Sequence, residues 1–249
     1  MFSIKKFNTL SDFNYTISYK EKTESTNNDA LNKIAENKYK NNMLFITDQQ
    51  THGRGRQNRK WHATPTSHLA FSLIITPHIN YKKSGLISLM AGVSIIEGLR
   101  NLTKINFELK WPNDIIYNNK KIGGILIETK KNNSNSVYVI GIGININEEI
   151  SNFPLQLQSN ITSLYMLTKK RYENEVVLIN ILNMIQRNLI NINSIHSKWI
   201  SYCSHIDKII SFNADNNKIT GQFLGITQNG HAVVNINERN HIFSSGELL

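Results

Sequence analysis

The chain has a single cysteine, Cys203, among its 249 residues. One thiol cannot form an internal disulfide, and it leaves too few thiol ligands for a cysteine-built zinc site. This scarcity is typical of a reducing compartment, and we expect a cytoplasmic location. Long apolar runs are lacking as well. No segment approaches the roughly 18 apolar residues of a membrane span, and residues 1–12 have no apolar run of signal-peptide length.

Acidic residues are scarcer than basic ones. The chain has 28 Lys and Arg against 18 Asp and Glu, a net charge of +10, which favours an anionic ligand or an acidic protein partner. A nucleic-acid-binding module is the competing class. Against that class, the positive charge is scattered along the chain, and the aromatic signature of RNA-binding sheets is absent. We therefore expect no specific DNA binding.

The densest cluster of positive charge is residues 53–61, with the sequence GRGRQNRKW. Arginine and lysine are rarely buried without a partner, and glycine weakens regular structure, so we expect a loop. Glycines let a backbone approach a phosphate closely, and arginine binds phosphate or carboxylate through two donors at once. The loop is thus a candidate anion site that would order over its ligand. A solvated basic turn is the alternative for this segment taken alone.

Apolar patterning predicts a mixture of strands and helices in residues 1–203. Strands are expected at residues 15–19, 43–47, 68–75, 107–117, 120–128 and 137–144. Helical spacing predicts helices at residues 85–102 and 173–192, with a shorter one near 195–200. A proline, Pro112, interrupts the fourth strand and predicts a bulge or an edge position. The hydroxyl of Ser25 or Thr26 is expected to cap a further helix.

The pattern changes after Cys203 to four short strands, at residues 206–212, 218–226, 231–236 and 241–243. The Asn229-Gly230 pair between two of them is a strong turn signal. Short strands of this kind predict a small β-barrel or sandwich. We therefore place a domain boundary near Ser204, which divides the chain into residues 1–203 and 204–249.

Five segments together resemble the biotin–protein ligase family, in order and in approximate spacing. They are Glu24-Ser25-Thr26-Asn27; Gln50 with the loop Gly53-Arg54-Gly55-Arg56-x-x-Arg59-x-Trp61; Lys110-Trp111-Pro112-Asn113-Asp114; Lys121-x-Gly123-Gly124-Ile125-Leu126-Ile127-Glu128; and Gly141-Ile142-Gly143-Ile144-Asn145. The tail, with Gly246-Glu247, resembles the family's small SH3-like C-terminal domain. The resemblance implies an α+β fold, with a mixed sheet packed against helices as in class II synthetases and biotin–lipoate ligases.

The sequence departs from the family pattern inside the signature loop. Gln57-Asn58 stands where many members have Arg-Gly, and His52 and His62 replace residues that are often small. These changes leave the chemistry intact and affect the expected loop dynamics. Some members carry an N-terminal DNA-binding module, and the 24 residues before Ser25 are too few for it. The resemblance therefore implies the form without a repressor domain.

The family reaction has two steps, and the resemblance implies both. The carboxylate of biotin attacks the α-phosphate of ATP, giving biotinoyl-5′-AMP and pyrophosphate. A lysine of a biotin carboxyl carrier domain, part of a biotin-dependent carboxylase, then attacks this mixed anhydride. ATP, biotin and Mg²⁺ are the expected small molecules. Such a reaction needs positioning and charge stabilisation, and it needs no nucleophile from the enzyme.

The resemblance also implies a set of site residues. Catalytic roles are expected for Lys121, Arg54 and Arg56. Biotin is expected to contact Ser25, Thr26, Asn27, Gln50, Gly53, Arg54, Gly55, Arg56, Lys121, Gly123, Gly124 and Gly141. ATP is expected to contact Arg56, Arg59, Trp61, Asn113, Asp114, Lys121 and Asn145, and Asp114 is the candidate Mg²⁺ ligand.

Structural alternatives accompany several of these roles. Lys121 suits a solvated hairpin lysine, Asp114 suits a carboxylate that caps its own turn, and Trp61 fits the site and the core equally well. A lipoate-type ligase would share the fold and the adenylation chemistry, although the arginine loop and the segment around Pro112 favour biotin. Some family members dimerise through sheet edges, so the resemblance is compatible with a homodimer.

Overall fold

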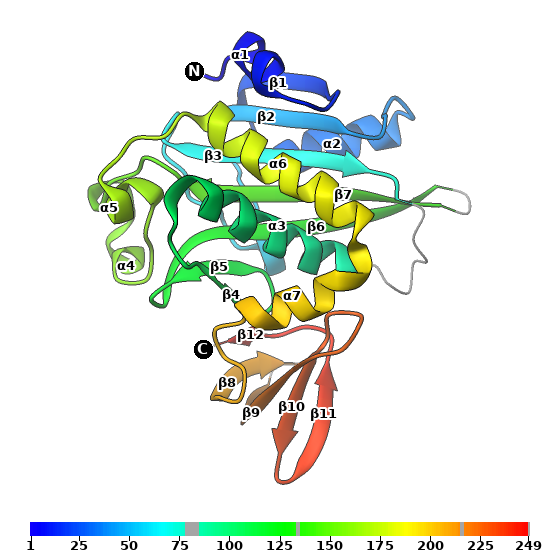
Figure 1. Ribbon diagram of the computed structural model, residues 1–249, viewed down its shortest axis with the longest axis vertical. Coiled ribbons are helices and arrows are strands. Elements are labelled where there is room, and N and C mark those ends of the chain that lie inside the picture. Colours follow the sequence, from blue (N-terminus) through cyan, green and yellow to red (C-terminus); the bar gives the residue numbers. More distant parts are fainter. Residues whose placement is uncertain (78–84, 133–134, 215–216, 249) are drawn as a thin grey trace.

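A seven-stranded mixed sheet forms the centre of the computed structural model, which describes residues 1–77, 85–132, 135–214 and 217–248 (Figure 1). The strand order is β1-β2-β3-β7-β6-β5-β4, with β1 and β2 parallel and all other neighbours antiparallel. The strands are β1 Thr16–Thr23, β2 Met43–Gln50, β3 His68–Ile75, β4 Glu108–Lys110, β5 Asp114–Tyr117, β6 Lys120–Asn132 and β7 Asn135–Asn145. The mixed sheet confirms the expected fold class.

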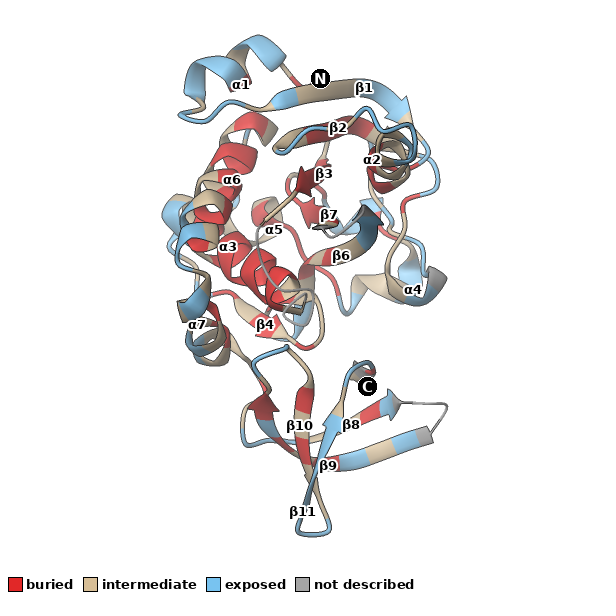
Figure 2. Ribbon diagram, turned by 90° about the vertical axis from the view of Figure 1, so that its right-hand side faces the viewer, coloured by how far each residue is buried: buried red, intermediate tan, exposed pale blue. Residues whose placement is uncertain are grey.

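Helices cover both faces of this sheet (Figure 2). They are α1 Ile4–Leu10, α2 Thr26–Ala35, α3 Gly85–Thr103, α4 Leu155–Gln158, α5 Leu164–Thr168, α6 Asn174–Ile190 and α7 Ile195–Tyr202, with 3-10 turns at Arg56–Asn58, Ile150–Asn152 and Ile192–Ser194. The helices α3 and α6 lie on one face, and α2 lies on the other, where Ala30 packs against Phe45 and Ile74. Because β3 is covered on both sides, all eight of its residues are buried.

The helix α3 packs closely on α6 through a glycine. A Cβ at Gly98 would lie 2.9 Å from the backbone of Asn180 and Ile181, which confirms that this glycine permits close helix approach. By length and composition α3 is apolar enough to cross a membrane, yet 67% of it is buried inside the protein. Its apolar surface is therefore accounted for by packing against the sheet and α6.

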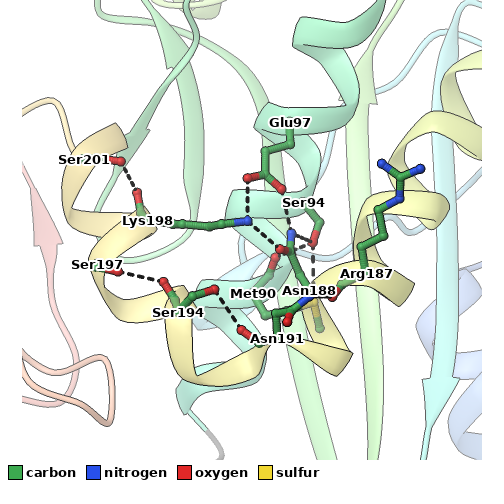
Figure 3. Close-up of polar contacts among 10 residues, drawn as sticks. All are labelled: Met90, Ser94, Glu97, Arg187, Asn188, Asn191, Ser194, Ser197, Lys198 and Ser201. Carbon is green, nitrogen blue, oxygen red and sulfur yellow. Dashed lines mark hydrogen bonds and ion pairs between the residues drawn. The ribbon is translucent and has the colours of Figure 1, made fainter.

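A buried polar network ties α3, α6 and α7 together, and Figure 3 shows its members. The ammonium of Lys198 lies 2.9 Å from Glu97 Oε1 and donates to Asn188 Oδ1 at 2.9 Å. Asn188 Nδ2 donates to Glu97 Oε2 at 2.8 Å and to Ser94 Oγ at 3.0 Å. Because Asn188 is only 2% exposed, its amide contributes both donors and its acceptor to a region that water does not supply.

The C-terminal strands form a second, antiparallel sheet in the order β11-β10-β9-β8-β12. Its strands are β8 Ile209–Ala214, β9 Asn217–Ile226, β10 Ala232–Ile236, β11 Arg239–Phe243 and β12 Glu247–Leu248. This small sheet fits an SH3-like domain, as expected. The proposed boundary near Ser204 falls between the end of α7 and the start of β8, and the division at that residue stays a proposal.

The second sheet is docked on the first through Trp111. The indole Nε1 donates to Gly230 O at 3.1 Å, and the ring meets Phe212 edge-on at 6.3 Å between centroids. The turn at Asn229 also lies against the first residue of α3, because a Cβ at Gly85 would overlap the Asn229 carbonyl. The expected Asn229-Gly230 turn is thus confirmed, and it is also a docking contact.

Three local expectations differ from the structure. Residues 107–117 are not one bulged strand: Lys110 pairs with Asp114 across a turn, so β4 and β5 form a hairpin with Pro112 in its turn. Ser25 makes no side-chain cap, because Gln50 Oε1 accepts from Thr26 N at 2.9 Å instead. The helix α1 was not expected either, since its apolar contacts come from distant elements: Phe7 packs edge-on against Tyr15.

One buried acid lies at the end of β7. Glu148 is 0% exposed, and neither of its carboxylate oxygens has a hydrogen-bond partner among the described residues. Burial raises its pKa to about 8, an effect that nearby backbone N–H groups of Glu148, Ile146 and Thr64 offset only in part. Glu148 is therefore protonated near neutral pH in the folded protein.

We predict that Asn188→Ala lowers the free energy of unfolding by roughly 1–3 kcal/mol, because Glu97 Oε2, Ser94 and Lys198 each lose one hydrogen-bond partner. Urea unfolding measures the change. Asn191→Ala is the matched control, because the Asn191 side chain is exposed and donates only within its own helix, to Arg187 O. Equal losses in the two variants would contradict a stabilising role for the network.

We predict that Glu148→Gln removes a pH dependence of stability. The folded protein holds this proton up to about pH 8, whereas the unfolded chain releases it near 4.5. The folded state thus binds more protons in that window, and wild-type stability falls as pH rises, by at most about 1.4 kcal/mol per pH unit. Thermal unfolding at pH 5 and pH 8 measures the difference. Glu149→Gln, at the exposed neighbouring position, should leave it in place; a flat wild-type profile would refute the assignment.

Candidate functional site

A cavity of about 690 Å³ opens where the arginine loop, the β4–β5 hairpin and the end of the C-terminal sheet meet. Its walls come from the start of α2, the end of β2, residues 54–62, the middle of β6 and β7, and β12. The cavity is lined by the following residues from the expected set: Ser25, Thr26, Asn27, Gln50, Arg54, Gly55, Arg56, Arg59, Trp61, Asn113, Asp114, Lys121, Gly124 and Gly141. Segments from both ends of the chain, from Ser25 to Leu248, are thus gathered around one space.

Three expected residues do not line this cavity. Asn145 is fully buried, and its amide donates to Thr162 O at 2.9 Å, so it anchors the chain beyond β7. A Cβ at Gly123 would lie 2.5 Å from Ile144 Cδ1, which places this glycine against the core side of β7. Gly53 lies behind the cavity wall, where a Cβ would meet Trp61 O at 2.9 Å. The two glycines permit close packing of the backbone, and Asn145 anchors the chain through its side chain.

Neutral polar groups form one wall. Gln50 Oε1 accepts from Thr26 N at 2.9 Å and from Thr26 Oγ1 at 3.2 Å. The hydroxyl of Ser72 lies 2.8 Å from Thr26 Oγ1 and 2.5 Å from Asn27 Oδ1. Ser72, inside β3, is buried behind this wall and supports it, and no motif in the sequence pointed to it. The result is an uncharged wall with amide and hydroxyl groups held in fixed orientations.

The arginine loop is folded back on itself. Gly55 N donates to Arg59 O at 2.7 Å, and Trp61 N donates to Gly53 O at 2.9 Å. Arg54 leaves this loop to form an ion pair with Glu128 on β6, with Nη2 2.7 Å from Oε2. The loop is therefore ordered by its own backbone and fastened to the sheet by one side chain.

Trp61 stands between the loop and the sheet. It lines the cavity, and a Cβ at Gly143 would lie 2.5 Å from its ring. Only a glycine leaves room for the indole at that point of β7. The ammonium of Lys121 lies over the same ring, 5.8 Å from its centroid. Trp61 thus belongs to the cavity wall, and it separates the neutral wall from Lys121.

Cations dominate the rest of the wall: Arg54, Arg56, Arg59, Lys60, Lys110 and Lys121. Asp114 is the one acidic residue among the described residues that line the cavity. Its Oδ1 lies 2.6 Å from Lys121 Nζ. This contact shows that neither residue is simply solvated. Burial lowers the pKa of Arg56, and Arg59 lowers it further, while Asp114 opposes the change; an arginine remains charged nonetheless. The cavity can hold more than one anion.

No cluster of three or more His, Cys, Asp or Glu that could bind a metal occurs in the described parts of the chain. A dedicated protein cage for a cation is therefore not present among these residues. Asp114 supplies one carboxylate at the cavity wall. One carboxylate fits the usual magnesium arrangement, in which the remaining ligands are phosphate oxygens and water.

The C-terminal sheet also reaches the cavity. Gly246 and Leu248 line it, together with Trp111 of the docking contact. A Cβ at Gly246 would lie 3.0 Å from both Phe212 and Trp111, so the chain passes closely over the indole here. Sequence reasoning singled out Gly246 only through the tail resemblance, and nothing in the sequence marked Leu248.

Comparison with known proteins places these features in context. The model of the biotin/lipoate A/B protein ligase family matches residues 19–145. The bifunctional ligase/repressor BirA of Bacillus subtilis is 32% identical over 221 residues, which cover 86% of this chain and 68% of that protein. A biotin--[acetyl-CoA-carboxylase] ligase of Mycobacterium tuberculosis is 30% identical over 146 residues, covering 57% of this chain and 52% of that one.

Solved structures of similar fold extend over nearly the whole chain. The biotin protein ligase from Aquifex aeolicus in complex with biotin and ATP superposes with a TM-score of 0.81 at 28% identity, covering 95% of this chain and 98% of that one. The apo structure of the Aquifex aeolicus protein gives a TM-score of 0.77 at 25% identity, with the same coverage of both chains.

We predict that Gly143→Ala displaces Trp61, because a Cβ at that position would overlap the indole. The free energy of unfolding should fall by about 1–3 kcal/mol, and acrylamide should quench the Trp61 fluorescence more strongly, with a Trp61→Phe variant identifying its signal. Gly55→Ala is the control for stability, since its Cβ would come no nearer than 3.5 Å to another residue. Unchanged quenching in Gly143→Ala would contradict the packing described.

Proposed function

Because this chain belongs to the biotin/lipoate A/B protein ligase family, we propose that it is an ATP-dependent biotin–protein ligase. It activates biotin with ATP and transfers it to the carrier domain of a carboxylase. The observation that carries this function is the division of one cavity into an uncharged polar wall and a cationic wall. An uncharged ureido ring suits the first, and two anions that must react with each other suit the second.

The neutral wall suits the ureido ring of biotin, which has two N–H donors and one carbonyl acceptor. Gln50 uses its oxygen to accept from Thr26 N, so its amide N–H groups remain as donors. Ser25, Thr26 and Asn27 add hydroxyl and amide groups from the start of α2, which is a favourable place for polar ligands. The backbone of Gly141 and Gly124 lines the same cavity, and Gly141 lets the Asn27 amide lie directly on β7.

The cationic wall suits the chemistry of the first step. A carboxylate oxygen of biotin forms a bond to the α-phosphorus of ATP while the bond to pyrophosphate breaks. Both reactants are anions, so the barrier depends on cations that hold them together and offset the charge growing on the phosphate. We assign this role to Lys121, with Arg54 and Arg56 holding the carboxylate and the phosphates. The Lys121–Asp114 ion pair must loosen as the substrates bind.

We assign the nucleotide side to Arg59, Trp61, Asn113 and Asp114. Asn113 Nδ2 donates to Ile125 O at 2.8 Å, which fixes the turn of the β4–β5 hairpin on β6. Mg²⁺ would be held by Asp114 and by ATP phosphate oxygens. When bound, it would offset phosphate charge. The residues assigned here would bind and orient the nucleotide, and their individual roles are proposals.

In the second step the amine of the acceptor lysine attacks the carbonyl carbon of the mixed anhydride, and AMP leaves with the electrons of the broken C–O bond. The acceptor is the carrier domain of a carboxylase, and the positive charge of the chain would attract an acidic carrier. We also propose a cytoplasmic location. A homodimer is a further proposal, because β1 is an edge strand of the large sheet and edge strands can pair with another chain.

We predict that Lys121→Ala slows pyrophosphate release from biotin, ATP and Mg²⁺ by at least about 100-fold, the cost typical of losing one charge-stabilising donor. Lys120→Ala is the matched control, because Lys120 is exposed at the neighbouring position of the same hairpin and should retain activity. Wild-type-like release from Lys121→Ala would remove this lysine from its role. Failure of the wild type to make biotinoyl-5′-AMP, judged by mass spectrometry, would refute the function itself.

A further inference from the structure

Glu128 connects two parts of the site that are far apart in the sequence. It lies on β6, at the end of the apolar run 125–127, and its side chain is 25% exposed. Its Oε2 accepts from Arg54 Nη2 at 2.7 Å and from Asn27 Nδ2 at 2.8 Å. One carboxylate oxygen thus joins the arginine loop to the start of α2.

The contact with Asn27 fixes the direction of that amide. Asn27 Nδ2 donates to Glu128, and Oδ1 accepts from Ser72 Oγ at 2.5 Å. The amide also lies directly on the backbone of Gly141, where a Cβ would overlap it. A carboxylate can only accept, so Glu128, together with the Leu126 carbonyl at 3.3 Å, selects the orientation of Asn27 in which the nitrogen faces β6.

The contact with Arg54 fixes the direction of the guanidinium. Glu128 holds one terminal nitrogen, and Arg54 Nε is buried without a hydrogen-bond partner among the described residues. A guanidinium is a rigid fork, so holding one nitrogen sets where the other donors point. Arg54 lies between two glycines, whose backbones restrain it little. The ion pair to β6 therefore supplies an orientation that the loop itself does not.

We propose that Glu128 is a positioning residue for biotin: its carboxylate orients Arg54 and Asn27 toward the vitamin without touching the substrate. Glu128 is not among the residues that line the cavity, which agrees with an action through its two partners. The proposal rests on the proposed function, because it takes biotin as the ligand of Arg54 and Asn27. It deepens that function by naming the residue that joins the neutral wall to the loop.

Glu128→Gln tests the proposal with little change of shape. Glutamine at this position lacks the negative charge that orients Arg54. We therefore expect the KM for biotin, measured by pyrophosphate release, to rise by about 10-fold or more. The KM for ATP should change by less than about twofold. Glu149→Gln is the matched control, because Glu149 forms an exposed ion pair with Arg171 at 3.1 Å and should leave both constants unchanged.

A second comparison separates positioning from a general structural effect. If Glu128 acts through Arg54, its substitution in an Arg54→Ala background should raise the biotin KM much less than in the wild type. An equal rise in both backgrounds would overturn the role of Arg54 in the proposal, and an unchanged biotin KM in Glu128→Gln would overturn the proposal as a whole. Failure of the wild type to release pyrophosphate with biotin would instead refute the proposed function. The two failures are therefore distinguishable.

Discussion

The site depends on holding several cations close together before any anionic substrate arrives. Arg54, Arg56, Arg59 and Lys121 line one cavity, and like charges at short range repel each other strongly where water is displaced. Two carboxylates offset this repulsion: Glu128 pairs with Arg54, and Asp114 pairs with Lys121. Both acids come from the neighbouring strands β5 and β6. The sheet therefore acts as a rigid source of negative charge for the cationic side chains, with Glu128 holding one nitrogen of Arg54 and Asp114 pairing with Lys121.

Close backbone approach is the second requirement, and glycines on β7 provide it. Asn27 lies on Gly141, and Trp61 lies on Gly143, two residues further along the same strand. Side chains at alternate positions point to the same face of a strand, so the two glycines open one continuous surface. The neutral wall and the indole can then meet over a single strand. A methyl group at either position would separate the elements that form the site.

Much of this arrangement could be predicted from the sequence, because its signals are local. Glycines within a strand are typical of close backbone approach, and the glycines of the fifth segment, Gly141 and Gly143, are such positions. Apolar spacing placed α3, α6 and five of the six expected strands of the large sheet near their observed positions. The failures have a different cause. Residues 107–117 form a hairpin because Lys110 pairs with Asp114. At the start of α2, the side chain of Gln50 accepts the hydrogen bond from Thr26 N. Both features depend on partners that residue spacing alone does not reveal. For the same reason Ser72 escaped notice, and Glu128 was given no role although it ends one of the five segments.

The coupling between the two sheets follows from Trp111. Its indole donates to Gly230 O in the second sheet, packs against Phe212 and lines the cavity of the first. Trp111 comes directly after Lys110, the last residue of β4. The β4–β5 hairpin also carries Asp114, which forms the ion pair with Lys121. A displacement of the C-terminal sheet would therefore move the indole, and through the hairpin it would move the acid that offsets Lys121. The cavity draws its wall from both sides of the proposed boundary near Ser204. The small sheet is thus part of the site as well as an addition to the fold.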